Sequence, residues 1–219
     1  MKSLKFLLIS LVIIAVVIFA GSPYYAAYQL KNAYDTHDGA TLTHHIDFEQ
    51  LQPNIQNQLT SKFANTLQQY PLVAQLGGEA LTEAADEFIH ASVTKAVTEE
   101  NIRSLINTQG QANQATKELA AAWAIASNKV DLQRLIQDII VQRGDINAVL
   151  KNQMQQIMSA QSTELESHVQ SGEDSAKPEL SYCGINCFTL SGQVKGYPLT
   201  LQMQREGLIG WKIINVVLP

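Results

Sequence analysis

The apolar positions at the start of the chain form one unbroken run. Lys2 and Lys5 precede the segment Phe6–Ala20, whose only polar residue is Ser10, and the next charge is Lys31. At ~1.5 Å of rise per helical residue, the segment covers roughly 22 Å of the ~30 Å hydrocarbon core of a bilayer. The uncharged residues that follow can supply the missing length, and they include three tyrosines suited to a membrane interface: Tyr24, Tyr25 and Tyr28. The pattern predicts a membrane-spanning helix.

This helix can be either a retained membrane anchor or a signal segment that is removed by cleavage. Lysines before an apolar run place the N-terminus in the cytoplasm and the rest of the chain outside. Removal of a signal segment by cleavage after Ala20 would put bulky Ile18 at the upstream specificity position. Cleavage after Ser22 would put Pro23 directly beyond the bond. We therefore expect residues 1–22 to be a retained anchor, with a cleaved signal segment as the alternative.

From residue 23 to about residue 170 the apolar residues recur every three or four positions, which predicts helices. Capping residues mark the expected starts: Ser22 followed by Pro23, Asp47, Thr98, Asp131 and Asp145. Glycine or proline marks the expected ends or breaks: Gly39, Pro53, Pro71, Gly110 and Gly144. Gln50 completes a capping-box-like pair with Asp47, and a further helix is expected over residues 81–97.

After Pro178 the pattern changes to alternation. Three strands are expected, over Tyr182–Leu190, Val194–Gln204 and Leu208–Leu218, with turns at Ser191-Gly192 and Arg205-Glu206-Gly207. Helices followed by a block of strands predict an α+β fold that ends in a three-stranded antiparallel meander. Residues 23–219 are expected to be one extracytoplasmic domain, helical over 23–170, with a linker over 171–179 and the meander over 180–219.

Composition narrows the possible functions. A formal net charge of −5 argues against a nucleic-acid surface, which needs clustered Lys and Arg. Glutamine is frequent but spread among helical apolar positions, which is typical of solvated helix faces. The sequence has no Gly-rich phosphate loop, no nucleophile elbow and no zinc-protease motif. No catalytic residue and no cofactor are predicted.

The two cysteines, Cys183 and Cys187, leave three readings open. Along one straight strand they would lie ~13 Å apart, too far to bridge. If Gly184-Ile185-Asn186 forms a tight hairpin loop, a disulfide is feasible, and an extracytoplasmic position favours it. Two buried thiols, or redox or metal chemistry, are the alternatives.

One polar cluster is a weak candidate for chemistry. His37, His44, His45 and Asp47, with Asp38 among them, fall in a connection between helices. Imidazole and carboxylate groups can bind zinc or act as acid and base. No motif fixes their directions, adjacent His44 and His45 are expected to point apart, and Asp47 already has a capping role. A solvated loop is the competing interpretation.

Three segments resemble an uncharacterised bacterial family known as domain of unknown function 2939. They are Ser22-Pro23-Tyr24-Tyr25 through Ile46-Asp47-Phe48; Val97-Thr98-Glu99-Glu100-Asn101-Ile102 with Leu105 and Ile106; and Leu201 through Gly207 with Trp211-Lys212-Ile213 and the closing Val216-Val217-Leu218-Pro219. Glu99 stands where the family usually has proline. The resemblance implies a small bacterial membrane protein with no established activity. A looser likeness to cone-shaped folds of the nuclear-transport-factor-2 kind says nothing about function.

Together these observations favour a non-enzymatic protein held in a bacterial inner membrane by a single pass, with its domain in the periplasm. It is expected to bind a partner protein or a small apolar ligand. The alternative location is secreted or periplasmic after signal cleavage. The alternative function is a metal-assisted hydrolase that uses the cluster from His37 to Asp47.

Overall fold

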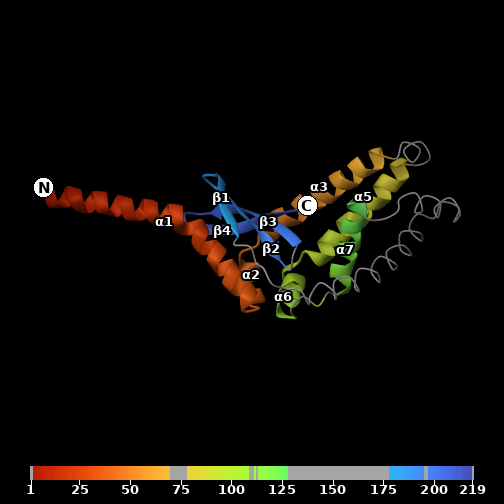
Figure 1. Ribbon diagram of the computed structural model, residues 1–219, viewed down its shortest axis with the longest axis horizontal. Helices are drawn as coiled ribbons and strands as arrows, with labels where there is room; N and C mark the ends of the chain where they lie inside the picture. Colours follow the sequence, from red (N-terminus) through yellow and green to blue (C-terminus); the bar gives the residue numbers. More distant parts are fainter. Residues whose placement is uncertain are drawn as a thin grey trace.

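The chain is helical first and β-stranded last. A computed structural model describes residues 2–69, 78–108, 111, 113–127, 178–194 and 197–218. Its helices are α1 (Lys2–Asp35), α2 (Gly39–His44), α3 (Phe48–Gln68), α5 (Gly78–Ala96), α6 (Glu99–Asn107) and α7 (Gln114–Ala126). Its strands are β1 (Glu179–Gly184), β2 (Cys187–Val194), β3 (Tyr197–Glu206) and β4 (Gly210–Val217). The α+β prediction is confirmed, with four strands in place of three (Figure 1).

The helix α1 runs without interruption through Pro23, so the expected helix start at Ser22 is wrong. Proline has no N–H to donate to the carbonyl of Phe19, one turn earlier. The hydroxyl of Ser22 donates to that carbonyl instead, at 2.9 Å, and this replaces the lost hydrogen bond. Figure 1 shows α1 bending where it reaches the sheet, which is the kink that an internal proline produces.

The sequence predicts that Gly39 ends a helix, and this prediction is wrong. Gly39 is the first residue of the short helix α2. The side chain of Asp38 caps α2 by accepting a hydrogen bond from the Thr41 N–H at 3.0 Å. A Cβ at position 39 would lie 2.7 Å from the carbonyl oxygen of Arg103 and 2.8 Å from Oδ1 of Asn107, both in α6. Glycine is required here because it lets α2 and α6 approach closely.

The start of α3 is as predicted. Oδ1 of Asp47 accepts from the Gln50 N–H at 3.1 Å, and the Gln50 amide donates to Oδ2 at 2.8 Å. The expected break at Pro53 is wrong, because α3 continues through it. A proline inside a helix costs ~3 kcal/mol. Burial of the apolar stripe of α3, at ~1.5–3 kcal/mol for each side chain, offsets that cost. The stripe consists of Leu51, Ile55, Leu59, Phe63 and Leu67.

Helices α5 and α7 pack against α3 and form a second apolar layer with it. Ala85, Ile89 and Val93 of α5 are buried in this layer, together with Ala122 and Ile125 of α7. Thr98 caps α6 as predicted, because its hydroxyl accepts from the Asn101 N–H at 3.2 Å. The helices expected after Asp131 and Asp145, and most of the linker over 171–179, lie outside the described residues.

The four strands form an antiparallel meander in the order β1-β2-β3-β4. The segment Tyr182–Leu190, predicted as one strand, is a hairpin whose turn is Ile185-Asn186. The predicted turn at Ser191-Gly192 lies inside β2, where these residues pair with Thr200 and Leu199 of β3. Pairing with the neighbouring strand therefore overrides the local preference of Ser-Gly for a turn.

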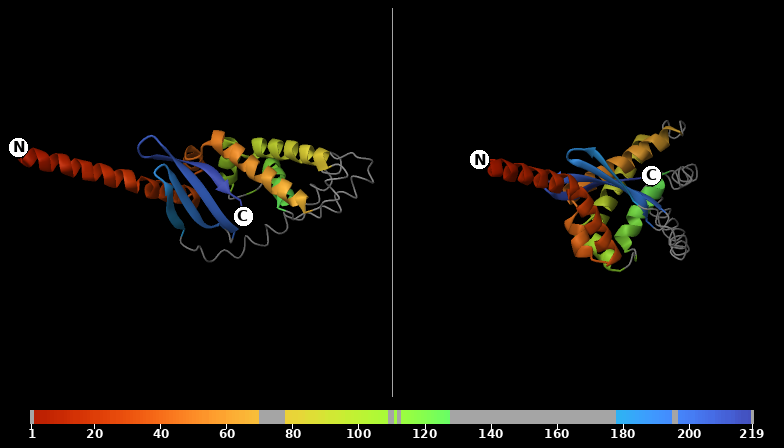
Figure 2. Two further views of the ribbon diagram at one scale, coloured as in Figure 1. Left: turned by 90° about the horizontal axis from the view of Figure 1, so that it is seen from above. Right: turned by 60° about the vertical axis from the view of Figure 1, so that its left-hand side comes forward.

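One face of the sheet carries the core. Phe188 pairs with Met203 across β2 and β3, and Met203 pairs with Ile213 of β4, so the three form a buried row. The second half of α1 and helix α3 pack against this face through residues that include Leu30 and Ile55. Figure 2 shows the sheet beside the bent part of α1 and α3, with the first half of α1 projecting away.

Candidate functional site

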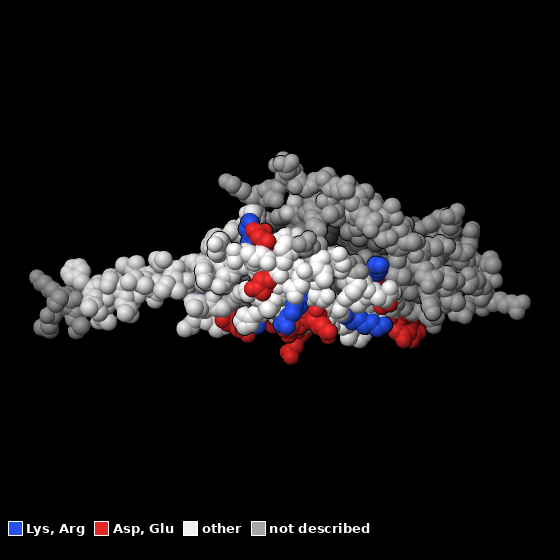
Figure 3. Space-filling view, turned by 90° about the horizontal axis from the view of Figure 1, so that it is seen from below, with Lys and Arg blue, Asp and Glu red and all other residues white. Residues whose placement is uncertain are grey.

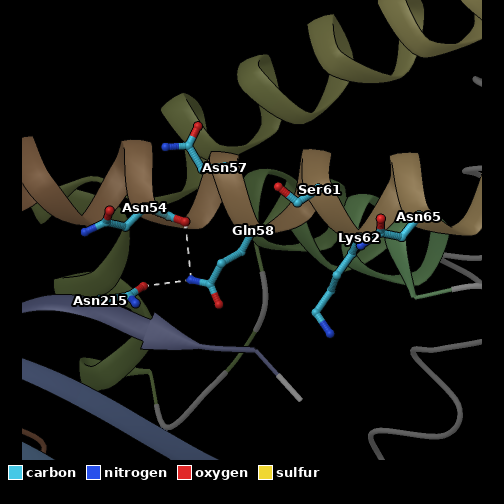
Figure 4. Close-up of a pocket in the computed structure, with 7 residues that line it drawn as sticks. All are labelled: Asn54, Asn57, Gln58, Ser61, Lys62, Asn65 and Asn215. Atoms are coloured by element: carbon cyan, nitrogen blue, oxygen red, sulfur yellow. Dashed lines mark hydrogen bonds between the residues drawn. The ribbon is translucent and has the colours of Figure 1, made fainter.

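A shallow hollow lies beside α3 in the described part of the chain. Its volume is about 400 Å³, and it lies where α3 passes the end of β4 (Figure 4). All seven lining side chains are polar, and only one carries a charge: Asn54, Asn57, Gln58, Ser61, Lys62, Asn65 and Asn215. We call it the amide hollow because five of the seven are Asn or Gln.

Two of these amides hold the outer edge of the sheet. Nδ2 of Asn54 donates to the Ile214 carbonyl at 2.8 Å, and Nε2 of Gln58 donates to Oδ1 of Asn215 at 2.7 Å. The same Gln58 nitrogen donates to the Val216 carbonyl at 3.0 Å, and its Oε1 accepts from the Leu218 N–H at 3.0 Å. Exposed strand edges tend to recruit foreign strands, so these contacts protect β4 and fix α3 against it.

The rest of the hollow faces solvent. Asn57, Ser61 and Asn65 are exposed along one face of α3, at spacings of about one helical turn. The ammonium group of Lys62 lies 5.3 Å from the centre of the Trp123 ring, a cation–π contact with α7. The three exposed side chains offer neutral hydrogen-bond donors and acceptors on one helix.

Sequence reasoning missed this site because it treated the polar positions of α3 as a solvated face. The sequence does contain a signal for this site, a neutral polar face on the helix. This face lies opposite the buried stripe, has no acidic residue and repeats at helical spacing through Asn54, Gln58, Ser61 and Asn65. Asn215 could not be assigned to the same site, since its approach to Gln58 depends on how the sheet packs.

His37 has a structural role at the end of α1. It adopts a left-handed backbone conformation, with φ 55°. Its N–H donates to the Tyr34 carbonyl at 3.1 Å, and the Asp38 N–H donates to the Ala33 carbonyl at 2.8 Å. These two bonds are the pattern of a Schellman motif, which ends α1 and turns the chain into α2. The His37 side chain is exposed.

His45 and Asp47 join the connection between α2 and α3 to β4. The Ile213 N–H donates to the His45 carbonyl at 2.7 Å, and the Asp47 N–H donates to the Ile213 carbonyl at 2.9 Å. Nδ1 of His45 donates to the Trp211 carbonyl at 3.3 Å. His44 is exposed, and its ring contacts the His45 ring edge to face at 5.7 Å between centres, so the two do not point apart as expected.

The four candidate side chains therefore do not converge on a common ligand. Among the residues that the structure describes, no three His, Cys, Asp or Glu side chains lie close enough together to hold a metal ion. His37, His45 and Asp47 each have a structural role in ending, joining or starting an element.

The stability contributed by Asp38 depends on pH. The Thr41 hydroxyl donates to the Asp38 carboxylate at 2.6 Å, and the Thr41 N–H donates at 3.0 Å; these bonds hold the pKa of Asp38 below its ordinary value. A carboxyl whose pKa is lower in the folded chain favours folding when it is ionised. Its contribution is fully present above the unfolded pKa of ~4 and is lost as pH falls through the folded pKa.

We therefore expect the free energy of unfolding to fall on acidification below about pH 4, and to fall less in the variant Asp38→Asn. Asparagine keeps an oxygen that can cap α2 but does not titrate there. Denaturant unfolding at a series of pH values measures both. Parallel pH profiles for the two proteins would contradict the assignment.

The predicted disulfide between Cys183 and Cys187 is present. The turn Ile185-Asn186 brings the two Cα atoms to 5.0 Å, within bridging distance. The bond closes the tip of the hairpin between β1 and β2.

Reduction of this disulfide should lower the free energy of unfolding by about 2 kcal/mol, because closing so short a loop removes little entropy from the unfolded chain. Comparing the native protein with the double variant Cys183→Ser/Cys187→Ser by denaturant unfolding measures the loss. A double variant as stable as the native protein would show that the bridge contributes nothing.

The bend in α1 is held by a group of side chains from the sheet. Ser22, which is buried, accepts hydrogen bonds from Nε1 of Trp211 at 2.9 Å and from Nη1 of Arg205 at 3.0 Å. Its own proton goes to the Phe19 carbonyl, so both acceptor positions and the donor of the hydroxyl are used. The Tyr182 hydroxyl donates to the carbonyl of Ala20 at 2.7 Å. We call these contacts the exit clamp.

Arg205 is the centre of the exit clamp. Its guanidinium carbon lies 3.7 Å from the centre of the Phe19 ring and 4.4 Å from that of Trp211, between two aromatic side chains. Nη2 also donates to the Phe19 carbonyl at 3.3 Å. The arginine thus supplies a second donor to the carbonyl that Pro23 leaves without its usual partner.

These features define an α+β protein with an N-terminal helix long and apolar enough to cross a membrane. A family model described as "Protein of unknown function (DUF2939)" matches residues 12–105. The resemblance to that family is therefore confirmed over residues 12–105, from within α1 to most of α6. The resembling segment in the last two strands lies outside the match, and its likeness to the family stays a prediction. No curated protein and no solved structure matches the chain.

Proposed function

We propose that this protein is a single-pass membrane protein of a bacterial inner membrane, whose domain lies in the periplasm and binds a polypeptide partner without catalysing a reaction. The observation that carries the binding proposal is the amide hollow, a shallow concave surface lined by polar residues of α3 and β4. The orientation rests on the lysines that precede the apolar run.

A retained anchor is supported by the exit clamp. Cleavage after Ser22 would remove the hydroxyl that accepts from Trp211 and the carbonyl that accepts from Arg205. Cleavage after Ala20 would remove the carbonyl to which Tyr182 donates. Polar groups deprived of their partners at a partly buried site are costly, so the domain is built to keep this segment.

A polypeptide suits the amide hollow better than a small apolar ligand does. Side-chain amides donate and accept at once, which matches the donor and acceptor of each peptide unit. An apolar ligand would cover Asn57 and Asn65 without offering them hydrogen bonds, at an energetic cost. The metal-assisted hydrolase is not carried forward, because His37, His45 and Asp47 serve the fold.

Site-specific photo-crosslinking in intact cells tests this proposal. A photoreactive amino acid placed at Asn57 in the full chain should give a crosslinked protein, and the same group at Glu87, an exposed residue of α5, should not. The crosslinked product at Asn57 should disappear when Ser61→Tyr fills the hollow. A crosslinker at Glu87 in the same variant should still give no product, which shows that the substitution has not made the surface bind other proteins. Equal crosslinking at the two positions, or none at Asn57, would contradict the proposal.

A further inference from the structure

Two hairpin tips at one end of the sheet expose large apolar side chains. Ile185 lies in the turn between β1 and β2 and is 76% exposed. Leu208 and Ile209 lie in the turn between β3 and β4 and are 79% and 59% exposed. Leu and Ile at the tips of turns contribute nothing to the core, so their exposure calls for another explanation.

One arginine fixes both tips beside α1. Nε of Arg205 donates to the Ile185 carbonyl at 3.4 Å, and Nη1 donates to the Leu208 carbonyl at 2.8 Å. The backbone N–H of Arg205 donates to the Asn186 carbonyl at 3.0 Å. Because the same guanidinium also bonds the Phe19 carbonyl, the tips are held at the level of Phe19 along the helix.

The two tips point toward the projecting part of α1. In the left view of Figure 2, both turns lie at the end of the sheet nearest the N-terminal half of the helix. On the face in Figure 3, this half of α1 shows no acidic or basic residue beyond its first residues. The large apolar residues from Phe6 to Ile18 are all more than half exposed, so no described element covers them.

The length of the projecting part implies that the bilayer reaches the tips. From Phe6 to Phe19 a helix rises roughly 20 Å, which is ~10 Å less than the hydrocarbon core. A segment that is too short must thin the bilayer or draw adjoining residues into its boundary. Tyr25 and Tyr28, exposed on the next turns of α1, suit such a boundary.

We propose that the hairpin tips formed by Ile185, Leu208 and Ile209 insert into the outer boundary of the lipid bilayer, as a second membrane contact beside the helix. The inference rests on the proposed membrane span. Its ligand is the acyl-chain and headgroup boundary of the lipid, which accepts branched apolar side chains. Glu206, at the end of β3 beside the second tip, has a carboxylate oxygen 3.7 Å from the ammonium group of Lys212, and this pairing reduces its repulsion from anionic lipids.

Lipid-depth measurements on the full chain test this inference. The protein is reconstituted in phosphatidylcholine vesicles with a minor fraction of phosphatidylglycerol. A single cysteine is introduced as Leu208→Cys and labelled with an environment-sensitive dye. Labelling needs no reduction, since both native cysteines form the disulfide. We expect blue-shifted emission and quenching by lipids that carry a nitroxide near the headgroup; Ile209→Cys should behave in the same way.

Two matched positions separate this inference from the proposed function. Val12→Cys, in the middle of the projecting helix, should be quenched most by nitroxides deep in the acyl chains. Asn57→Cys, in the amide hollow, should not be quenched. Quenching at Val12 with none at Leu208 and Ile209 would overturn the insertion of the tips and leave the span intact. Absence of quenching at Val12 would overturn the span and, with it, the insertion of the tips.

Discussion

Replacing Trp211 with alanine should lower the free energy of unfolding by about 3–5 kcal/mol, the cost of emptying a site filled by a large aromatic side chain. Trp211 is only 2% exposed and contacts the Phe188 ring at 6.0 Å between centres. Its N–H is also one of the two sheet donors to Ser22 in the exit clamp. The variant therefore loses both packing and a buried hydrogen bond. Denaturant unfolding of the full chain in detergent measures the loss.

Two control variants separate these contributions. Trp211→Phe keeps an aromatic ring in the core but removes one hydrogen-bond donor to Ser22. The lost hydrogen bond should lower the free energy of unfolding by about 1 kcal/mol, and the smaller ring should lower it a little further. Leu208→Ala, on the exposed tip of the hairpin between β3 and β4, should change stability by no more than about 0.5 kcal/mol. If Trp211→Ala were no more destabilising than Leu208→Ala, the exit clamp would not belong to the folded core.

Phe63→Ala should destabilise the helical layer by a similar amount, about 3–5 kcal/mol. Phe63 is 1% exposed and lies in the apolar stripe of α3, which meets both α5 and α7. A densely packed layer relaxes too little to fill the space of a whole aromatic ring. Thermal or denaturant unfolding followed by helical circular dichroism measures the effect.

Asn57→Ala is the matched control on the same helix. Asn57 is exposed on the opposite side, and alanine has a higher helix propensity than asparagine, so we expect stability to be unchanged or slightly raised. The same variant should weaken partner binding if the amide hollow is the binding surface. Equal destabilisation by Phe63→Ala and Asn57→Ala would show that α3 does not bury the face assigned to it.

Local signals in the sequence were sufficient for the fold class and for several helix ends. Asp47 and Thr98 were predicted as caps, and their side chains accept the expected N–H groups. These predictions succeed because a cap is a contact between residues three apart. The disulfide was predicted as one of three possibilities, and the turn that selects it is also local.

The errors arose where distant contacts override local preference. Pro23 and Pro53 both favour a helix boundary, yet both lie inside helices. At Pro23 the missing hydrogen bond is replaced with help from Arg205, which is far away in the sequence. Gly192 favours a turn, but pairing with β3 keeps it in a strand. No spacing rule connects such residues to their partners before the fold is known.

The candidate site shows the same division. The composition of the stripe on α3 is visible in the sequence, but its meeting with Asn215 is not. Conversely, the histidines that looked chemically suggestive have conformational roles, such as the left-handed turn at His37. A polar cluster in a connection between helices is therefore weak evidence for chemistry until its backbone is known.

We propose that α1 is a retained membrane helix whose exit turn belongs to the folded domain. Intact mass spectrometry of the protein extracted from the membranes of the expressing bacterium tests it most directly. We predict a chain in the membrane fraction whose mass still includes the apolar segment and the residues Phe19, Ala20 and Ser22. A shorter, stably folded chain that begins after Ala20 or Ser22 and is released in soluble form would contradict the account.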